Sequence, residues 1–289
     1  MKILDGKLLA KKLNDELGKK ILSYNNKYGR RPHLLVILVG ENPASQVYVK
    51  NKEKKAAEVG IKSTVIRLSK NVSENNLLKV IDEANANIAV DSILVQLPLP
   101  NHINSNKVID RVSIEKDVDG FNSKNVGLLA LGRPNVIPCT PLGCFKMLES
   151  VTDVEGKNIV ILGRSSIVGK PLAYLLTNKN ATVTIAHSKT KNLQSLCLNG
   201  DVVIAALGKP NYVKKEWIKE NAVIIDVGIN VVGHKNGIRK IVGDVDYEGV
   251  FKKASFISPV PGGVGPMTIH CLLANTFLLT KNRNFYNLK

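Results

Sequence analysis

The chain has 289 residues, of which 44% are hydrophobic and 22% charged, a balance that excludes a disordered chain and allows two ordinary domains. Its formal net charge of +17 suits a nucleic acid, a membrane surface or an anionic small molecule, but the lysines are spread along the chain and only 5% of residues are aromatic, which disfavours nucleic acid. Because no apolar run has the length of a membrane span and no signal-peptide core opens the chain, we expect a cytoplasmic protein with no membrane partner.

The first half of the chain alternates helical periodicity with short apolar runs. Leucines or isoleucine recur every four residues from Leu9 to Ile21, which predicts an amphipathic helix there. The segments predicted next are a strand at 34–39, a helix at 44–59, a strand at 63–68, a helix at 74–87 and a strand at 92–97. Strand–helix–strand alternation indicates parallel strands joined by right-handed crossovers, and therefore a first α/β unit.

The second half repeats this alternation after a stretch rich in glycine and proline at 132–143, which is typical of a crossing between domains. Strands are predicted at 158–162, 182–186, 201–207 and 222–228, with a helix from about Val168. Purely apolar strands joined by helices indicate a parallel sheet covered on both faces, the doubly wound architecture.

These patterns predict an α/β protein of two α/β domains with a cleft between them. Residues 1–139 form the first domain, and residues 140–267 form a Rossmann-type dinucleotide-binding domain. A last apolar helix, within 268–289, has no strand after it, so we expect it to pack back onto the first domain and complete it.

A glycine loop stands where the strand at 158–162 passes into a helix. Its glycines, Gly163 and Gly169, are five residues apart, so it lacks the spacing of a triphosphate loop, and Ser165 occupies the middle glycine position of the dinucleotide fingerprint. Helix N-termini at the carboxyl ends of parallel strands offer unpaired N–H groups to phosphate. The loop therefore suits a dinucleotide, although a tight turn that only packs the helix would use the same glycines. The predicted cofactor-binding residues here are Gly163, Arg164, Ser165, Val168 and Gly169, joined by Gly228 and Ile229 after the strand at 222–228.

The end of the next strand bears on the choice between NAD and NADP. In an NAD site an acidic residue about 20 positions after the loop binds the ribose hydroxyls, but residues 187–190 read His-Ser-Lys-Thr. An end without an acid accommodates a 2′-phosphate. We therefore expect NADP in preference to NAD, with Arg164, Ser165 and Ser188 as its phosphate ligands.

Three polar side chains share one face of the helix predicted at 44–59. Ser45, Tyr48 and Lys52 fall at i, i+3 and i+7, so a hydroxyl, a phenol and an amine project together. A tyrosine and a lysine one turn apart can stack on a flat ring and move a proton. Taken alone, Lys52 fits equally well a solvated charge on a wet face.

Two further stretches bring an amide and a carboxylate to the same end of the first domain. Gln96 ends the strand at 92–97, and Asp117 and Asp119 lie in a turn that ends in Gly120. An amide and a carboxylate there can meet the lysine over one cleft, where a buried lysine acts as general acid and base. Each residue separately also suits a structural role, Gln96 satisfying backbone groups and Asp119 capping the turn.

Seven motifs together resemble the bifunctional methylenetetrahydrofolate dehydrogenase/methenyltetrahydrofolate cyclohydrolase family. They occur in order between about residue 40 and residue 270: "PASQVYVKNKEKKA", "QLPLP", "KDVDGF", "PCTPLG", "GRSSIVGKP", "GDVDY" and "PVPGGVGPMT". Two conservative departures are Ser166, where asparagine is common, and Ser258, where threonine is usual. A shikimate-type dehydrogenase, the competing oxidoreductase hypothesis, would need neither "QLPLP" nor "KDVDGF".

The resemblance implies roles for particular residues. Lys52 is similar to the lysine that serves the cyclohydrolase step, and Gln96 to the amide that tunes it. Asp119 resembles the acid that holds the pterin ring, and Tyr48 the residue that orients the folate. A return loop, Pro261, Gly262 and Gly263, is similar to the one that lines the same cleft, and Ser45 joins it in binding substrate.

The resemblance also implies the reaction. Such a protein oxidises 5,10-methylenetetrahydrofolate to 5,10-methenyltetrahydrofolate with NADP and hydrolyses the product to 10-formyltetrahydrofolate, in one-carbon metabolism and purine biosynthesis. The family suggests a homodimer, and the positive charge suits folates that carry one or several glutamates. No metal is expected, since none of the five histidines has metal-ligand spacing, and the four cysteines, without a C-x-x-C pair, are expected to be reduced and buried.

Overall fold

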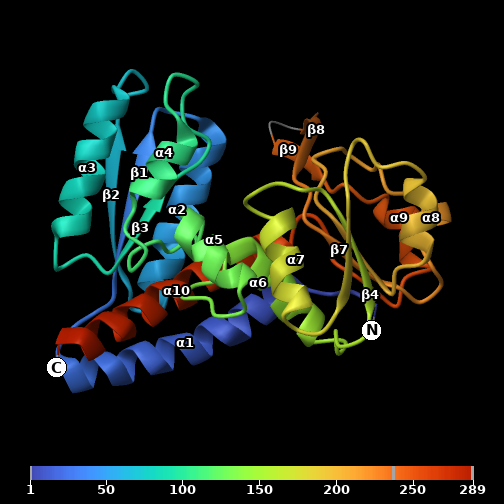
Figure 1. Ribbon diagram of the computed structural model, residues 1–289, viewed down its shortest axis with the longest axis horizontal. Coiled ribbons are helices and arrows are strands. Elements are labelled where there is room, and N and C mark those ends of the chain that lie inside the picture. Colours follow the sequence, from blue (N-terminus) through green and yellow to red (C-terminus); the bar gives the residue numbers. More distant parts are fainter. Residues whose placement is uncertain (1, 236–237, 288–289) are drawn as a thin grey trace. The chain divides into compact units, whose positions relative to one another are not determined.

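A computed structural model describes residues 2–235 and 238–287, and there the chain divides into two compact units (Figure 1). The three-stranded unit comprises residues 12–139 and the chain from Ile269 onward; the five-stranded unit comprises the chain up to Lys11 and residues 140–268. Residues 1, 236–237 and 288–289, which the predicted domains and last helix include, lie outside the described part. The assignment of folate to the first domain and of the dinucleotide to the second stays a prediction.

The three-stranded unit is built on a parallel sheet with strand order β2-β1-β3. Its strands are β1 (His33–Val39), β2 (Lys62–Leu68) and β3 (Ser92–Val95). Its helices are α2 (Pro43–Glu58), α3 (Glu74–Ala86), α4 (Ser105–Arg111), α5 (Ser123–Ala130) and most of α1 (Gly6–Tyr28) and α10 (Val264–Asn287). Every residue of β1 is buried, as a central strand covered on both faces requires.

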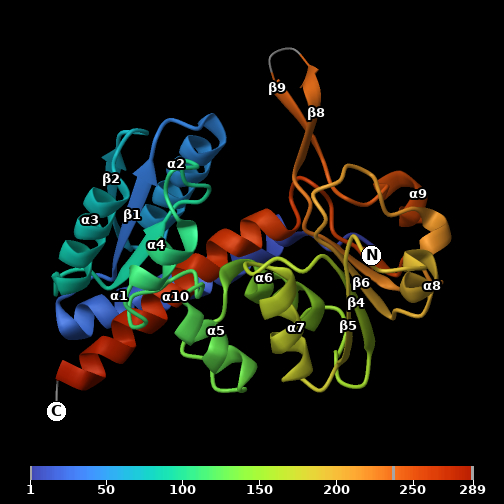
Figure 2. The ribbon, with the colours of Figure 1, turned by 45° about the horizontal axis from the view of Figure 1, so that its top comes forward.

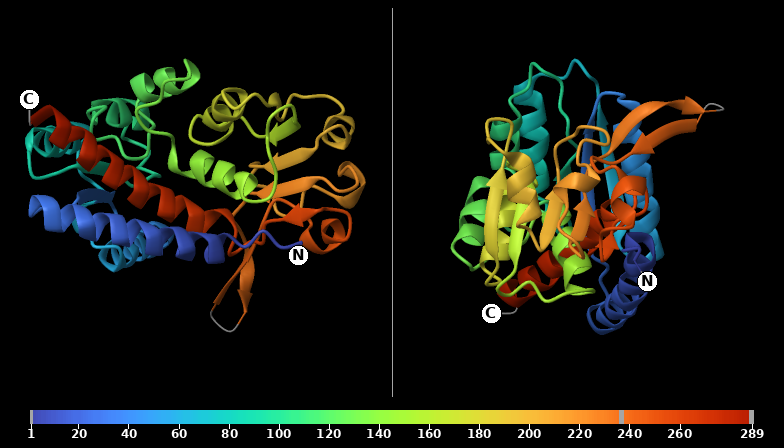
Figure 3. Two further views of the ribbon diagram at one scale, coloured as in Figure 1. Left: turned by 90° about the horizontal axis from the view of Figure 1, so that it is seen from below. Right: turned by 90° about the vertical axis from the view of Figure 1, so that its right-hand side faces the viewer.

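One face of this sheet packs on α3 and α4. Alternate residues of β1, from Leu35 to Val39, join Leu77 and Ile81 of α3 and Val108 of α4 in one buried cluster. Because side chains alternate along a strand, the remaining β1 residues face the other side. The segments of α1 and α10 in this unit run alongside each other, with the rings of Tyr24 and Phe277 edge to face 5.5 Å apart (Figure 3).

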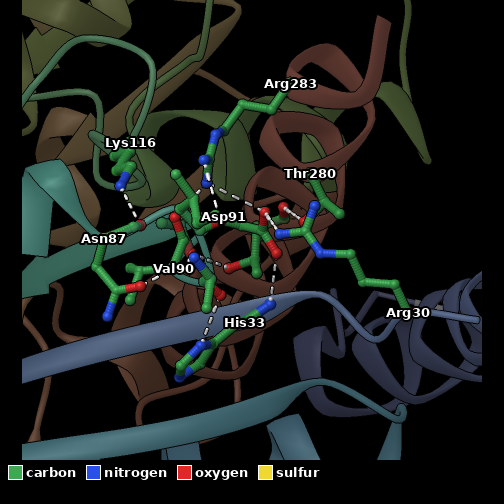
Figure 4. Close-up of polar contacts among 12 residues, drawn as sticks. Arg30, His33, Asn87, Val90, Asp91, Lys116, Thr280 and Arg283 are labelled. Carbon is green, nitrogen blue, oxygen red and sulfur yellow. Dashed lines mark hydrogen bonds and ion pairs between the residues drawn. The ribbon is translucent and has the colours of Figure 1, made fainter. Parts of the chain in front are cut away.

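A buried carboxylate ties α10 to the amino-terminal edge of the sheet. Asp91, fully buried just before β3, accepts an N–H from His33 at the start of β1 (2.9 Å) and pairs with Arg30 and with Arg283 of α10 (Figure 4). Nearby, the Lys116 ammonium donates to three backbone carbonyls at the end of α3, the ordinary role of a cation at a helix C-terminus. This edge lies opposite the one where Gln96 follows β3.

The five-stranded unit is built on a parallel sheet with strand order β10-β7-β6-β4-β5. Its strands are β4 (Asn158–Leu162), β5 (Thr182–Ala186), β6 (Val202–Ala205), β7 (Val223–Asp226) and β10 (Phe256–Ile257). Its helices are α6 (Thr140 onward within Cys139–Glu149), α7 (Gly169–Thr177), α8 (Leu193–Leu198), α9 (Tyr247–Phe251) and a 3-10 turn at Lys215–Trp217. An antiparallel hairpin, β8 (Asn230–Lys235) with β9 (Ile238–Val242), extends from this unit (Figure 2).

The strand order creates a crevice in this second sheet. From β4 the chain goes first to β5 on one side and then to β6 on the other, so the topological switch point, where the ligand crevice of a doubly wound sheet lies, falls between β4 and β6. The predicted doubly wound sheet is therefore confirmed, and the predicted bounds of β4 and β5 agree with the structure. The hairpin and β10 were not expected, since residues 230–242 carry no clear apolar alternation.

All four cysteines are buried thiols, as predicted. Within residues 2–235 and 238–287, the helices are too short or too polar to cross a membrane.

Candidate active site

Lys52 and Gln96 meet at the carboxyl edge of the three-stranded sheet. Lys52 is 9% exposed, and its Nζ donates to Gln96 Oε1 at 3.0 Å; the other end of the amide, Gln96 Nε2, donates to the carbonyl of Leu97 at 2.7 Å. Gln96 lies one residue beyond β3 and bonds through its backbone N–H to Ile37 of β1. The amide is therefore held at both ends and presents its oxygen to the amine.

Asp119 lies beside this pair. Burial raises the pKa of the Asp119 carboxyl, opposed by the positive charge of Lys52 and by a hydrogen bond from the Cys139 thiol. In turn, burial and the neighbouring Asp119 raise the pKa of Cys139 well above its usual range, so the thiol stays protonated and donates. Lys52, Gln96 and Asp119 are thus brought together, as the sequence predicts, with Cys139 as an additional neighbour.

The turn that carries Asp119 is organised by Asp117. The buried Asp117 carboxylate accepts the backbone N–H groups of Gly120, Phe121 and Asn122 at 2.9 to 3.3 Å and the side-chain amide of Asn125 at 2.8 Å. Burial raises the pKa of Asp117 to about 6 in spite of these bonds. The capping role considered for Asp119 therefore belongs to Asp117, which leaves the Asp119 side chain available to a ligand.

Helix α2 positions Lys52. Asn42 caps it by accepting the N–H groups of Ala44 and Ser45 through Oδ1, and a proline at the first helical position suits its fixed φ. Ser45 and Lys52 lie on the buried stripe of the helix, whereas Tyr48, at the margin of that stripe, is 38% exposed. Partial burial raises the pKa of the Tyr48 phenol, which keeps it protonated at neutral pH.

The glycine loop after β4 has no room for side chains at either glycine. Gly163 has φ +125°, and a Cβ there would lie 2.2 Å from the carbonyl oxygen of Ala206, beyond β6; a Cβ at Gly169 would lie 2.1 Å from the oxygen of Gly163. The loop is therefore pressed against the start of the loop after β6. This close approach at the switch point is where a Rossmann sheet admits the backbone of a dinucleotide.

The expectation of unpaired N–H groups at the start of α7 is wrong for the residues that the structure lets us follow. Ser165 Oγ accepts the N–H groups of Val168 (3.1 Å) and Gly169 (3.3 Å), the Ser165 carbonyl accepts that of Lys170, and Pro171 has none. A serine can fold back in this way because its hydroxyl oxygen has two lone pairs. At the start of α7 the hydroxyl hydrogen of Ser165 remains to donate to a phosphate.

Two predicted phosphate ligands lie at equivalent places on neighbouring strands. Leu162 of β4 pairs with Ala186 of β5, so Arg164 and Ser188 each stand two residues beyond a paired position. Both are exposed, and the turn at 187–190 is closed by the side chain of Thr190, whose Oγ1 accepts the N–H of His187. A cavity of about 570 Å³ opens in this region, lined by Thr190, Asn192, Leu193, Gln194, Ser195, Leu198, Tyr212 and Trp217.

The remaining predicted residues lie in the five-stranded unit. Gly228 is buried after β7, where a Cβ would lie 2.3 Å from Asp244 Oδ1, and Ile229 is 51% exposed. Pro261, Gly262 and Gly263 connect β10 to α10; Gly262 has φ +111°, and a Cβ at Gly6 would lie 1.9 Å from the Gly263 oxygen. Their role beside Lys52 stays a prediction.

Three buried groups near these sites escaped the sequence reasoning. Cys139 was treated as an inert hydrophobe, yet its thiol donates to the carbonyl of Val118 at 3.5 Å, next to Asp119. Asn275 of α10 donates to the carbonyls of Val118 and Ile137, which joins the segment next to Asp119 to the segment before α6. Asp244 was noticed only as part of a motif. A metal site has no counterpart among the described histidines, cysteines and acids.

Comparison with known proteins gives the same two parts in the same order. A family model described as "Tetrahydrofolate dehydrogenase/cyclohydrolase, catalytic domain" matches residues 4–119, and one described as "Tetrahydrofolate dehydrogenase/cyclohydrolase, NAD(P)-binding domain" matches residues 138–284. Among curated proteins, the "Bifunctional protein FolD" of Wolbachia sp. subsp. Drosophila simulans is 53% identical over 278 residues, covering 96% of this chain and 94% of the relative.

Solved structures agree over nearly the whole chain. The bifunctional methylenetetrahydrofolate dehydrogenase/cyclohydrolase of Campylobacter jejuni is 48% identical with a TM-score of 0.93, covering 98% of this chain and 99% of its own. The corresponding enzyme of Trypanosoma brucei, solved with NADP cofactor and inhibitor, is 38% identical with a TM-score of 0.94 and 97% coverage of both chains.

Proposed function

The chain belongs to the tetrahydrofolate dehydrogenase/cyclohydrolase family, and we propose that it oxidises 5,10-methylenetetrahydrofolate to 5,10-methenyltetrahydrofolate with NADP and hydrolyses that product to 10-formyltetrahydrofolate. The observation that carries the proposal is the 3.0 Å contact between Lys52 Nζ and Gln96 Oε1 beside Asp119. A lysine, an amide and a carboxylate converge there without belonging to any helix cap or surface ion pair that the structure describes.

Hydrolysis of the methenyl cation needs a base and an acid at one place. Water adds to the one-carbon centre, and the new C–O bond forms as one proton leaves the water. The C–N5 bond then breaks as N5 gains a proton, and the remaining hydroxyl proton leaves to solvent as the formyl C=O forms. The Lys52 amine is placed to accept the first proton and return it to N5, because Gln96 fixes its position. The carboxylate of Asp119 binds the pterin ring nitrogens, as a carboxyl facing an amidine does.

Folate would lie at the margin of the buried stripe of α2, beside Tyr48. Tyr48 presents a ring for stacking and a protonated phenol for hydrogen bonding one turn before Lys52. Ser45 supports that surface from the buried stripe. From the family resemblance alone we further propose that Pro261, Gly262 and Gly263 contribute to substrate binding. Lysines spread over the surface favour folates with several glutamates, since each adds a carboxylate.

The residues after β4, β5 and β7 fit a dinucleotide. The missing side chains at Gly163, Gly169 and Gly228 let the loops of the protein approach one another closely at the switch point, where a dinucleotide docks, and Val168 and Ile229 supply apolar contact. When bound, NADP accepts the hydride from the methylene carbon, which is the redox chemistry that the protein itself lacks. The protein's part is to orient the folate against the nicotinamide and to exclude water until the oxidation is complete.

NADP is favoured over NAD by the exposed groups at the ends of β4 and β5. Arg164 supplies a guanidinium fork, Ser165 a hydroxyl hydrogen and Ser188 a second hydroxyl. The turn at 187–190 has no carboxylate to repel the 2′-phosphate. The adenosine end of the cofactor would then extend toward the cavity that begins at Thr190. We further propose that the enzyme is a cytoplasmic homodimer, as the family resemblance implies.

The proposal is tested by a spectrophotometric assay of the purified protein with methylenetetrahydrofolate, with NADP and NAD supplied side by side. We expect NADPH to form and methenyltetrahydrofolate to appear and then to decay to the formyl compound faster than it does without protein. A protein that reduces neither dinucleotide and leaves the decay of added methenyltetrahydrofolate unchanged would refute the function.

A further inference from the structure

The segment Gly243–Asp246 follows the hairpin and has no part in the function proposed above. Asp244 within it is completely buried, yet its carboxylate is fully engaged. Oδ2 accepts the backbone N–H groups of Leu207 (2.5 Å) and Gly208 (2.9 Å), and Oδ1 accepts that of Lys209 (2.9 Å) and the side-chain amide of Asn230 (2.9 Å). Three consecutive N–H groups of one loop thus converge on a single side chain.

That loop is one wall of the crevice at the switch point. Residues 207–209 directly follow Ala206, whose carbonyl oxygen touches the place where Gly163 would carry a Cβ. Ala206 in turn donates its N–H to Leu162 of β4 (2.8 Å). Residues 207–209 therefore continue directly from the residue that contacts the glycine loop.

The backbone of Asp244 is in turn hydrogen-bonded to a second buried aspartate. The carboxylate of Asp226, at the end of β7, accepts the N–H groups of Gly228, Asp244 and Val245, each at 2.9 Å. A Cβ at Gly243 would lie 1.8 Å from Asp226 Oδ2, so only glycine allows this approach. The Gly-Asp pair at 243–244 is therefore the sequence that lets one carboxylate hold the next.

Further backbone bonds join the same segment to the far end of the loop. Asn211 donates its N–H to the Gly243 carbonyl (3.0 Å), and Val213 donates to that of Asp244 (2.9 Å). The chain after β6 is thus clamped at 207–209 by a side chain and at 211–213 by main chain. Three of the four hydrogen bonds that the buried Asp244 carboxylate accepts thus come from this one loop, and the fourth comes from Asn230.

We propose that Asp244 is a positioning residue for dinucleotide binding: its carboxylate holds residues 207–209 in the shape against which the cofactor docks. The proposal rests on the function proposed above. Without this acceptor the three N–H groups would turn toward water, and the binding-competent loop would be only a fraction of the population. The apparent affinity for NADP falls by that fraction, while chemistry in the three-stranded unit is untouched.

The test compares Asp244→Asn with Asp246→Asn. Asparagine keeps the shape but turns one acceptor oxygen into a donor that faces N–H groups. Asp246 is two residues away, more exposed, and pairs with Lys214 at the surface (3.4 Å), so its variant is the matched control. For each protein, calorimetry gives the Kd for NADP, hydrogen exchange gives the protection of the 207–209 amides, and hydrolysis of added methenyltetrahydrofolate reports on the other unit.

We expect Asp244→Asn to raise the Kd for NADP roughly 10- to 100-fold and to expose the 207–209 amides, with cyclohydrolase activity retained and the control unchanged. An unchanged Kd would overturn the proposal, and so would an equal loss of both activities by a variant that remains folded. If Asp244→Asn does not fold, Asn230→Ala decides, since it removes one partner of the carboxylate: a weaker Kd supports the proposal and an unchanged one overturns it. Wild-type protein that binds no NADP would refute the proposed function instead.

Discussion

The two candidate sites are made of different parts of the polypeptide. At the carboxyl edge of the three-stranded sheet the working groups are long side chains, Lys52 and Gln96, which reach one another from a helix and from a strand end. At the same edge of the five-stranded sheet the site is shaped by backbone, with Gly163 and Gly169 pressed against neighbouring carbonyls. Proton transfer needs a titratable group at one point, whereas a dinucleotide needs an extended surface that the chain can approach closely.

Both sites nevertheless depend on the same structural arrangement. A buried aspartate gathers backbone N–H groups beneath each: Asp117 under the turn of Asp119, and Asp226 with Asp244 under the loops after β6 and β7. The contrast lies in what these carboxylates support, a single side chain in one unit and a wall of main chain in the other. Substitutions in the two units should therefore separate the two activities.

The largest effect is expected from Lys52→Met. Methionine keeps the length and apolar stem but cannot carry a proton, so cyclohydrolase activity should fall roughly 10²- to 10⁴-fold while part of the dehydrogenase activity remains. Hydrolysis of methenyltetrahydrofolate and reduction of NADP are measured on the same preparation. Lys54→Met, on the exposed side of the same helix, is the control and should retain both activities. Normal hydrolysis by the Lys52 variant would show that the lysine assignment is wrong.

The reverse separation is expected from Gly163→Ala. Here a methyl group meets the Ala206 oxygen at 2.2 Å on a backbone with φ +125°, so the loop must shift, and the Kd for NADP should rise roughly 10- to 100-fold with hydrolysis retained. Gly156→Ala is the matched control, because Gly156 also has positive φ (+70°) but nothing within 4 Å of the added Cβ. If both variants bind NADP equally well, close approach at Gly163 has no part in the cofactor site.

Most strands of the two parallel sheets could be predicted because apolar runs depend on neighbours in sequence. Apolar runs bounded by polar residues located β4 and β5 to the residue. The strand expected at 92–97 ends at Val95 in the structure, since the Gln96 side chain bonds to its own neighbour's carbonyl and the chain turns there. The side-chain trio at Lys52, Gln96 and Asp119 followed from the rule that parallel strands present their carboxyl ends at one edge.

What escaped prediction depends on partners far apart in the chain. Asp244 bonds to residues 35 to 37 positions earlier, and Asn275 to a carbonyl 157 positions earlier, and no local pattern marks such pairs. The expectation of unpaired N–H groups at α7 came from a rule about helices in general. Here the Ser165 hydroxyl accepts the N–H groups at the start of the helix, so the rule does not hold. Local chemistry thus determined the elements, whereas tertiary contacts determined which polar groups remain free.

A smaller effect is expected at the exposed rim of the cofactor site. Arg164→Ala should weaken the binding of NADP about 10-fold and the binding of NAD much less, because only NADP carries the 2′-phosphate that the partly solvated guanidinium contacts. Binding of both dinucleotides is measured by calorimetry at fixed ionic strength. Arg133→Ala, an exposed arginine of the three-stranded unit, controls for the change in net charge. Equal losses for NADP and NAD would place the 2′-phosphate elsewhere.

The smallest effect concerns Asp117 and Asp226, the buried aspartates that accept backbone N–H groups in the two units. Burial raises the pKa of Asp117 and of Asp226 from an ordinary 3.8 to about 6, so between about pH 4 and pH 6 the folded protein binds more protons than the unfolded chain does. The stability that these groups contribute is fully present below pH 3.8, the ordinary pKa of the unfolded chain, and is lost as the pH rises through about 6, the pKa in the folded protein. Removing either group should make the decline shallower, by at most about 1.4 kcal/mol per pH unit.

Urea unfolding of Asp117→Asn and Asp226→Asn at several pH values checks this, and the slope against pH is compared because the level also reflects lost hydrogen bonds. Asp201→Asn is the control: the Lys219 ammonium lowers the pKa of Asp201, so its titration lies below this window and the slope should match wild type. A wild-type slope in both test variants would mean that the backbone N–H groups keep the carboxylates ionised in spite of burial. Each carboxylate accepts three backbone N–H groups. If the slope changes in only one of the two variants, the two aspartates do not act alike, and the packing around each matters more than its number of backbone N–H donors.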